Sequence, residues 1–96
     1  MRKINDYDWN YLYDKSENFI KEFVPEANIN RGTMTIRGKI PIVDASFPVK
    51  GNKKNIDYLL QKDYILRKRG SNINGKRMFN IGIIFSKDGK HLYSIN

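Results

Sequence analysis

The spacing of hydrophobic residues changes along the chain, and this change limits the folds that the chain can adopt. Between residues 7 and 23 the positions of one helical face recur every three or four residues, and these positions are Trp9, Leu12, Tyr13, Ser16, Phe19, Ile20 and Phe23. Asp6 or Asp8 is suited to cap the start of such a helix, and Pro25 ends it. The sequence therefore predicts an amphipathic helix over residues 7–23.

Beyond this helix the period of the hydrophobic pattern shortens to two, which is typical of strands. Residues 32–37 alternate apolar and polar side chains, so a half-buried strand is expected there. Residues 40–44 predict a second strand. Pro41 favours an edge or irregular position for it, because proline donates no hydrogen bond to a sheet. Asn55 is suited to be a helix N-cap, and a short helix is expected over residues 55–62.

The last third of the chain predicts an antiparallel meander. Its three strands are expected near residues 64–69, 77–86 and 90–95. Residues 70–75 are rich in Gly, Ser and Asn and are interpreted as a loop between the first two strands. Asp88-Gly89 is typical of a two-residue hairpin turn between the last two strands, and such a turn pairs Phe85 with Leu92.

Alternation in the last two strands separates an apolar face from a mixed face. The apolar face carries Phe79, Ile81, Ile83, Phe85 and Leu92. The mixed face carries Met78, Asn80, Gly82, Ile84, Ser86, His91, Tyr93 and Ile95. We expect residues 1–96 to form a single α+β domain. In this domain the N-terminal amphipathic helix and the short second helix pack on one face of a twisted antiparallel sheet of about four to five strands.

Length and composition exclude several classes of protein. A chain of 96 residues is too short for a doubly wound nucleotide-binding fold or a TIM barrel. With no cysteine and one histidine, we expect no disulfide, no metal site and no cofactor. No apolar stretch is long enough for a signal peptide or a membrane span, so we expect a protein of a reducing cytoplasm that does not bind membranes.

The formal net charge of +8 is unevenly distributed. Residues 1–28 hold four basic and six acidic side chains, a net −2, whereas residues 29–96 hold fourteen basic and four acidic ones, a net +10. Residues 50–77 alone hold nine basic and two acidic side chains, a net +7. Such a concentration favours phosphate backbones or an acidic protein surface. The alternative is a solvated basic surface without a partner, produced by the compositional bias of a low-GC genome.

The basic segment over residues 65–78 is expected to form a hairpin with cations on both arms and a small polar tip. Together with two lysines just before it, this hairpin provides the candidate residues for binding nucleic acid or another partner: Lys53, Lys54, Arg67, Lys68, Arg69, Asn72, Asn74, Lys76 and Arg77. A two-stranded ribbon of this kind is able to follow a phosphate backbone or enter a groove. The alternative interpretation is that the cations protect an exposed hairpin from edge-to-edge aggregation.

His91 is the one histidine, and it shares the mixed face with Tyr93. It is a candidate general acid or base, with Tyr93, Arg67 or Arg77 stabilising a phosphorane-like transition state and Asp63 as a carboxylate partner. Residues 78–95 resemble the closing hairpin of small metal-independent ribonuclease and tRNase toxins of the barnase, colicin D and RelE type. This resemblance implies a ribonuclease, although the chain has no match for the helix-borne catalytic Lys or His of the colicin-type toxins, nor for the barnase-type glutamate.

Three functions are consistent with the sequence, and the first is the one that we favour. The first is a binding protein without catalytic activity whose basic hairpin engages nucleic acid or a nucleoprotein. The second is an inhibitor of phage or mobile-element type that binds and blocks a host protein or nucleoprotein complex in the bacterial cytoplasm. The third is a metal-independent endoribonuclease toxin that uses His91.

Overall fold

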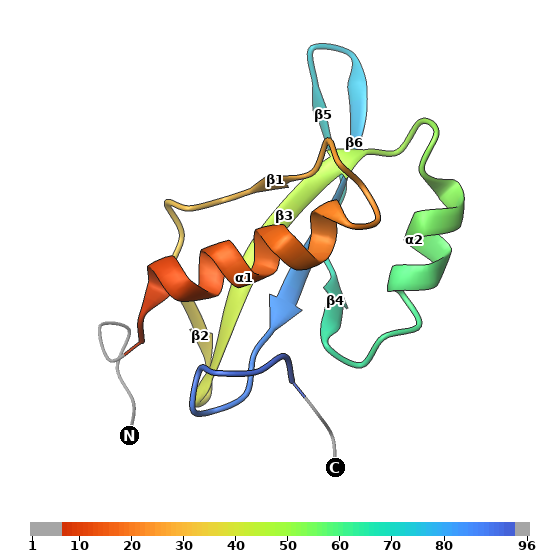
Figure 1. The fold of residues 1–96 in the computed structure, drawn as a ribbon. Coiled ribbons are helices and arrows are strands. Elements are labelled where there is room, and N and C mark those ends of the chain that lie inside the picture. The colour runs from red at the N-terminus through yellow and green to blue at the C-terminus, as the bar shows by residue number, and fades with distance from the viewer. Residues whose placement is uncertain (1–6, 94–96) are drawn as a thin grey trace.

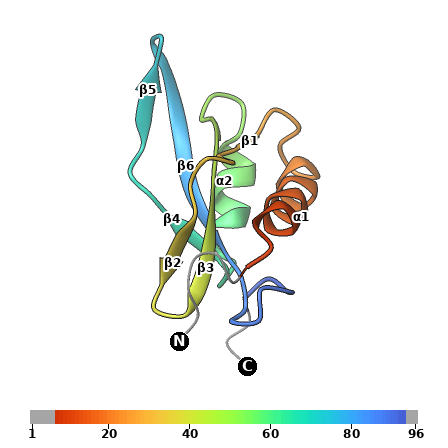
Figure 2. The same ribbon diagram turned by 90° about the vertical axis from the view of Figure 1, so that its left-hand side faces the viewer.

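The computed structural model describes residues 7–93 and has an α+β fold (Figure 1). Its elements in chain order are α1 (Trp9–Lys21), β1 (Asn28–Ile29), β2 (Thr35–Arg37), β3 (Ile40–Pro48), α2 (Lys53–Leu59), β4 (Ile65–Arg67), β5 (Ser71–Ile73) and β6 (Lys76–Ile84). The strands form one antiparallel, twisted and unclosed sheet. Both helices lie on the same face of this sheet, as Figure 2 shows, so the expected fold class is confirmed.

The two long strands β3 and β6 occupy the centre of the sheet. They pair from Ile42 opposite Ile84 to Pro48 opposite Met78. The short strands β1 and β2 both pair with the outer edge of β3, and β4 and β5 both pair with the outer edge of β6. The sheet is therefore four positions wide, and each outer position is shared by two short strands.

The central position of β3 contradicts the edge or irregular position predicted from Pro41. The strand extends well beyond the predicted residue 44, and its prolines lie at its two ends. Pro41 contributes its carbonyl oxygen, which accepts a hydrogen bond from the Phe85 backbone N–H at 3.0 Å. Because the residues between Pro41 and Pro48 all retain their N–H groups, the middle of β3 pairs on both edges.

Helix α1 agrees with the predicted amphipathic helix and is two residues shorter at each end. The Asp8 side chain accepts a hydrogen bond from the Tyr11 backbone N–H at 3.2 Å and so caps the helix. The predicted face is buried at Trp9, Leu12, Tyr13, Ser16 and Ile20, while Phe19 and Phe23 pack against the core as partly buried residues.

Helix α2 begins earlier than expected, with Asn52 rather than Asn55 as its N-cap. The buried Asn52 amide donates hydrogen bonds to Glu26 Oε1 and to the Pro48 carbonyl oxygen, each at 2.8 Å. These bonds tie the start of the helix to the end of β3 and to the segment after α1. No helix in the described part of the chain is long and apolar enough to cross a membrane.

The hydrophobic core lies between the sheet and the helices. The apolar face predicted for the C-terminal strands is confirmed, because Phe79, Ile81, Ile83 and Phe85 are buried in this core and Leu92 packs against it. Strand β3 contributes Val43, Ala45 and Phe47, and the helices contribute residues that include Leu12, Ile20 and Leu59. Among the described elements, both helices lie on this side, and the opposite face of the sheet, which none of them covers, is called the open face below (Figure 2).

The predicted loop over residues 70–75 is wrong, because this segment contains strand β5 and a tight turn. Asn74 and Gly75 have φ values of 52° and 78°, the combination that a two-residue hairpin turn of type I′ requires. Three residue pairs follow, from Ile73 opposite Lys76 to Ser71 opposite Met78. Asparagine and glycine tolerate positive φ better than other residues, so the chain reverses at these two positions.

The register predicted for the last hairpin is confirmed, because Phe85 pairs with Leu92. The predicted two-residue turn at Asp88-Gly89 is wrong: the Gly89 backbone N–H donates to the Ser86 carbonyl oxygen at 2.8 Å, so Lys87 and Asp88 are the central residues, and Gly89 follows them with a φ of 70°. The expected strand over residues 90–95 is not formed in the described part, where the pair of Phe85 and Leu92 is an isolated bridge, and residues 94 and 95 lie outside the described residues.

Candidate nucleic-acid interface

A cationic hollow of about 360 Å³ lies where the hairpin β5–β6 joins the rest of the molecule. Its lining residues are Val49, Lys53, Ile56, Arg67, Lys68, Gly70, Arg77, Met78 and Phe79, and we call this hollow the basic pocket. Four of these residues are basic and none is acidic. The apolar residues among them lower the local polarity and so strengthen the field of the cations.

Three separate elements bring Lys53, Arg67 and Arg77 to the basic pocket. Lys53 is the first residue of α2, Arg67 ends β4, and Arg77 belongs to β6. The guanidinium of Arg67 lies 5.7 Å from the centroid of the Phe79 ring, which restricts its orientation through a cation–π contact. The Arg77 carbonyl oxygen accepts a hydrogen bond from the Val49 backbone N–H at 3.0 Å and joins the hairpin to the end of β3.

These three cations have no acidic partner among residues 7–93. The ion pairs within that range engage Lys21 with Glu17, Arg31 with Asp14 and Glu17, and Lys68 with Asp44. The acidic side chains of these ion pairs thus contact cations other than Lys53, Arg67 and Arg77. The basic pocket therefore presents uncompensated positive charge to solvent.

Lys68 differs from its neighbours because its ammonium group lies on the open face of the sheet. There its Nζ contacts Asp44 Oδ1, and both side chains are half-buried. The aliphatic part of Lys68 crosses β6 at Gly82, where a Cβ atom would lie 3.6 Å from Lys68 Cε. Lys68 was predicted to bind a partner, but its charge is neutralised within the protein.

The remaining predicted residues lie around the basic pocket rather than in it. Lys54 is exposed on α2, and Arg69 lines a second hollow on the open face together with Asp44 and Asn80. Asn72 lies opposite Arg77 in the hairpin, and these two residues line a small hollow with Gly70 and Ser71. Lys76 lies opposite Ile73, and Asn74 occupies the turn itself.

The sequence did not point to the apolar part of the basic pocket. Val49 follows β3 and Ile56 lies on α2, and only the packing of that helix against the sheet brings them to Phe79. Nor did it indicate that Asp44 neutralises Lys68, because these residues are 24 positions apart. Neither relationship leaves a signal in the local pattern of residues.

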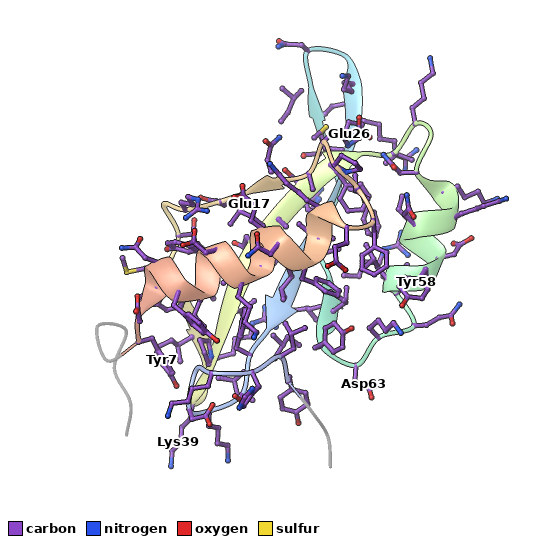
Figure 3. The ribbon with its side chains drawn as sticks, in the orientation of Figure 1. Tyr7, Glu17, Glu26, Lys39, Tyr58 and Asp63 are labelled. Atoms are coloured by element: carbon purple, nitrogen blue, oxygen red, sulfur yellow. The ribbon has the colours of Figure 1, made fainter. Side chains whose placement is uncertain are left out.

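The candidate catalytic residues do not line a common hollow. His91 is exposed and lines a hollow with Tyr7, Asp8, Tyr11, Asp88, Gly89 and Lys90, and neither Asp63 nor Tyr93 lines it. Asp63 lies between α2 and β4, well away from Tyr7 in Figure 3. The backbone of His91 forms two hydrogen bonds with Ser86 across the turn. Its N–H donates to Ser86 Oγ, and its carbonyl oxygen accepts from the Ser86 N–H.

Comparison of the chain with known protein families, with curated proteins and with solved structures finds no match. The fold and the surface define a small α+β protein with an uncompensated cationic pocket at the base of a β-hairpin. The likeness of residues 78–95 to ribonuclease toxins remains a resemblance of one hairpin.

Proposed function

We propose that this protein binds nucleic acid through the basic pocket and the adjoining hairpin, without catalysing a reaction. The observation that carries the proposal is the convergence of Lys53, Arg67 and Arg77 on a hollow with no acidic lining residue. A phosphate group fits such a set of donors, because arginine offers two parallel N–H groups and lysine offers a compact point charge.

The protection of a hairpin edge explains this arrangement less well than binding does. An edge is protected by scattered charges that point into solvent. Here Arg67 packs over the Phe79 ring and lines a hollow with cations from two other elements. Uncompensated cations at close range repel one another, and a bound anion relieves that repulsion.

The test is a salt titration of binding to fluorescently labelled nucleic acid, measured by anisotropy on duplex and single-stranded probes of one sequence. The test variant carries Arg67→Gln and Arg77→Gln. The control carries Arg37→Gln and Lys39→Gln, which remove the same charge at the β2–β3 turn, at the far end of the sheet from the hairpin (Figure 1). Circular dichroism verifies that both variants are folded.

We expect the wild type to lose affinity steeply with salt. Loss of two phosphate contacts in the test variant reduces the slope of log affinity against log salt by about two units. The control retains the wild-type slope. Absence of binding to every probe at low salt, or an equal loss in the two variants, would overturn the proposal.

A further inference from the structure

The β5–β6 hairpin projects beyond the sheet and both helices, as Figure 2 shows. All residues from Ser71 to Arg77 are exposed. The hairpin nevertheless has fixed anchors at its base, because Asn80 Nδ2 donates hydrogen bonds to the Arg69 carbonyl oxygen at 2.8 Å and to Ser71 Oγ at 3.1 Å. The projecting ribbon is thus held in one orientation before any partner arrives, which lowers the entropy cost of binding.

The size of this ribbon matches one of the grooves of nucleic acids. Three residue pairs at about 3.4 Å per residue give a projecting length of roughly 10 Å. The major groove of B-form DNA is about 12 Å wide and about 8.5 Å deep and admits a two-stranded β-ribbon. The major groove of A-form RNA is deep and too narrow for side chains to read, so it does not admit this hairpin.

The side chains near the tip suit contact with base edges. The side-chain amide of Asn72 makes no hydrogen bond within residues 7–93, and such an unengaged amide is able to pair with the adenine edge in the major groove. Arg77 lies opposite Asn72 and also lines the basic pocket, so the tip and the pocket form one continuous surface.

The same surface is poorly suited to single strands. Binding of single strands relies on exposed aromatic rings on which bases stack. The exposed aromatic residues of the described chain are Tyr11 on α1 and Tyr58 on α2. Neither of them lines the basic pocket or the small hollow that Asn72 and Arg77 line on the hairpin. Phe79 does line the basic pocket, but it is only 7% exposed and Arg67 lies over its ring.

We infer that the β5–β6 hairpin enters the major groove of double-stranded DNA. Asn72 contacts base edges there, and Lys53 and Arg67 contact the phosphate backbone beside the groove. This inference rests on the proposed function and adds to it the form of nucleic acid and the groove.

The experiment compares four probes of one sequence in the anisotropy assay: duplex DNA, duplex RNA and the two single DNA strands. Duplex DNA is also tested with methyl green, which occupies the major groove, and with netropsin, which occupies the minor groove. We expect duplex DNA to bind at least about tenfold more tightly than the other probes. Methyl green competes with the protein and netropsin does not.

A matched pair of variants locates the contact on the protein. Asn72→Asp introduces a negative charge at the tip, and Asn18→Asp introduces the same charge on an exposed position of α1. We expect Asn72→Asp to weaken binding to duplex DNA at least about tenfold, because the added carboxylate faces the negatively charged groove. Asn18→Asp is expected to change the affinity for duplex DNA less than about twofold.

Three results would overturn the inference while leaving the proposed function in place: equal binding of RNA or single strands, competition by netropsin instead of methyl green, or equal effects of the two aspartate substitutions. Absence of binding to all four probes would overturn both proposals.

Discussion

Lys68 and Asp44 are joined across the open face of the sheet, with Lys68 Nζ 2.5 Å from Asp44 Oδ1. Lys68 continues β4, Asp44 lies in β3, and the strand between them is β6. The lysine side chain crosses that strand at Gly82, where an added Cβ atom would make ordinary van der Waals contact with it. One of the cations predicted to bind a partner thus has an acidic partner within the protein.

Gly82→Ala is expected to destabilise the protein. The added Cβ would lie 2.8 Å from Ile42 Cγ2, and Ile42 is itself buried, so either the Ile42 side chain or the strand must shift. We expect a loss of about 1–3 kcal/mol in the free energy of unfolding, measured by urea denaturation. The control is Gly32→Ala, whose Cβ meets its nearest atom, Asn30 Oδ1, at 3.6 Å, and whose effect stays within about 0.5 kcal/mol. Equal effects would show that β6 tolerates a side chain at residue 82.

The coupling between Lys68 and Asp44 is measurable by a double-mutant cycle with Lys68→Ala, Asp44→Ala and the double variant. The side chains are 30% and 21% exposed, so solvent screens the pair in part. We expect a coupling of about 0.5–1 kcal/mol that weakens in high salt. Asp44→Ala alone also frees the Lys68 ammonium, and the proposed function then predicts a binding affinity for nucleic acid that depends more steeply on salt. A coupling of zero would show that the pair contributes no stability.

Tyr7 joins two turns that are far apart in the sequence. Its hydroxyl lies 2.9 Å from the Lys39 carbonyl oxygen and 3.0 Å from that of Lys87, and Figure 3 shows Tyr7 and Lys39 side by side. We expect Tyr7→Phe to lower the free energy of unfolding by about 1 kcal/mol, because the two carbonyl oxygens share the single hydroxyl proton and lose it. Tyr11→Phe is the matched control. Its hydroxyl bond to the Lys90 carbonyl oxygen is exposed, so thermal or urea unfolding should register a smaller loss.

Gly75→Ala tests whether the shape of the hairpin matters for binding. A Cβ at Gly75 meets no atom within 4 Å, so the cost, about 1 kcal/mol, comes from its φ of 78° alone. Gly38→Ala imposes the same kind of strain, at φ 64°, in the β2–β3 turn. Both variants should be destabilised to a similar degree, and only Gly75→Ala should weaken binding to duplex DNA. Equal affinities of the two variants would show that binding does not depend on the hairpin's turn.

Asp88 makes the stability of the 86–91 turn dependent on pH. The Ser86 hydroxyl and the Lys90 backbone N–H donate to its carboxylate and hold its pKa below the ordinary value of 3.8. Because the pKa is lower in the folded state, the stabilisation is complete above the unfolded-state pKa and is lost as pH falls through the folded-state pKa. Urea unfolding at a series of pH values should find Asp88→Asn less stable than the wild type near neutral pH, with the difference shrinking in acid. A difference independent of pH would contradict this prediction.

Local features of the sequence were sufficient to predict α1, the apolar face of β6 and the pairing of Phe85 with Leu92, although the turn between these two residues is centred on Lys87 and Asp88 rather than on Asp88 and Gly89. Each depends on the spacing of neighbouring residues or on the dihedral preferences of two adjacent ones. The Asn74-Gly75 turn carried the same type of signal, but the nearby Gly70 and Ser71 favoured a longer loop. The position of β3 was predicted wrongly, because the neighbours of a strand depend on contacts distant in the sequence.

The sequence alone determined the excess of positive charge between residues 50 and 77 and the periodicity that makes an α+β fold. Tertiary structure decided which of those cations are neutralised. Lys68 pairs with Asp44, whereas Arg67, its neighbour on the chain, faces the basic pocket without an acidic partner. The physical reason is that successive residues of a strand point to opposite faces, and ion pairing requires contact in space, which the order of strands in the sheet establishes.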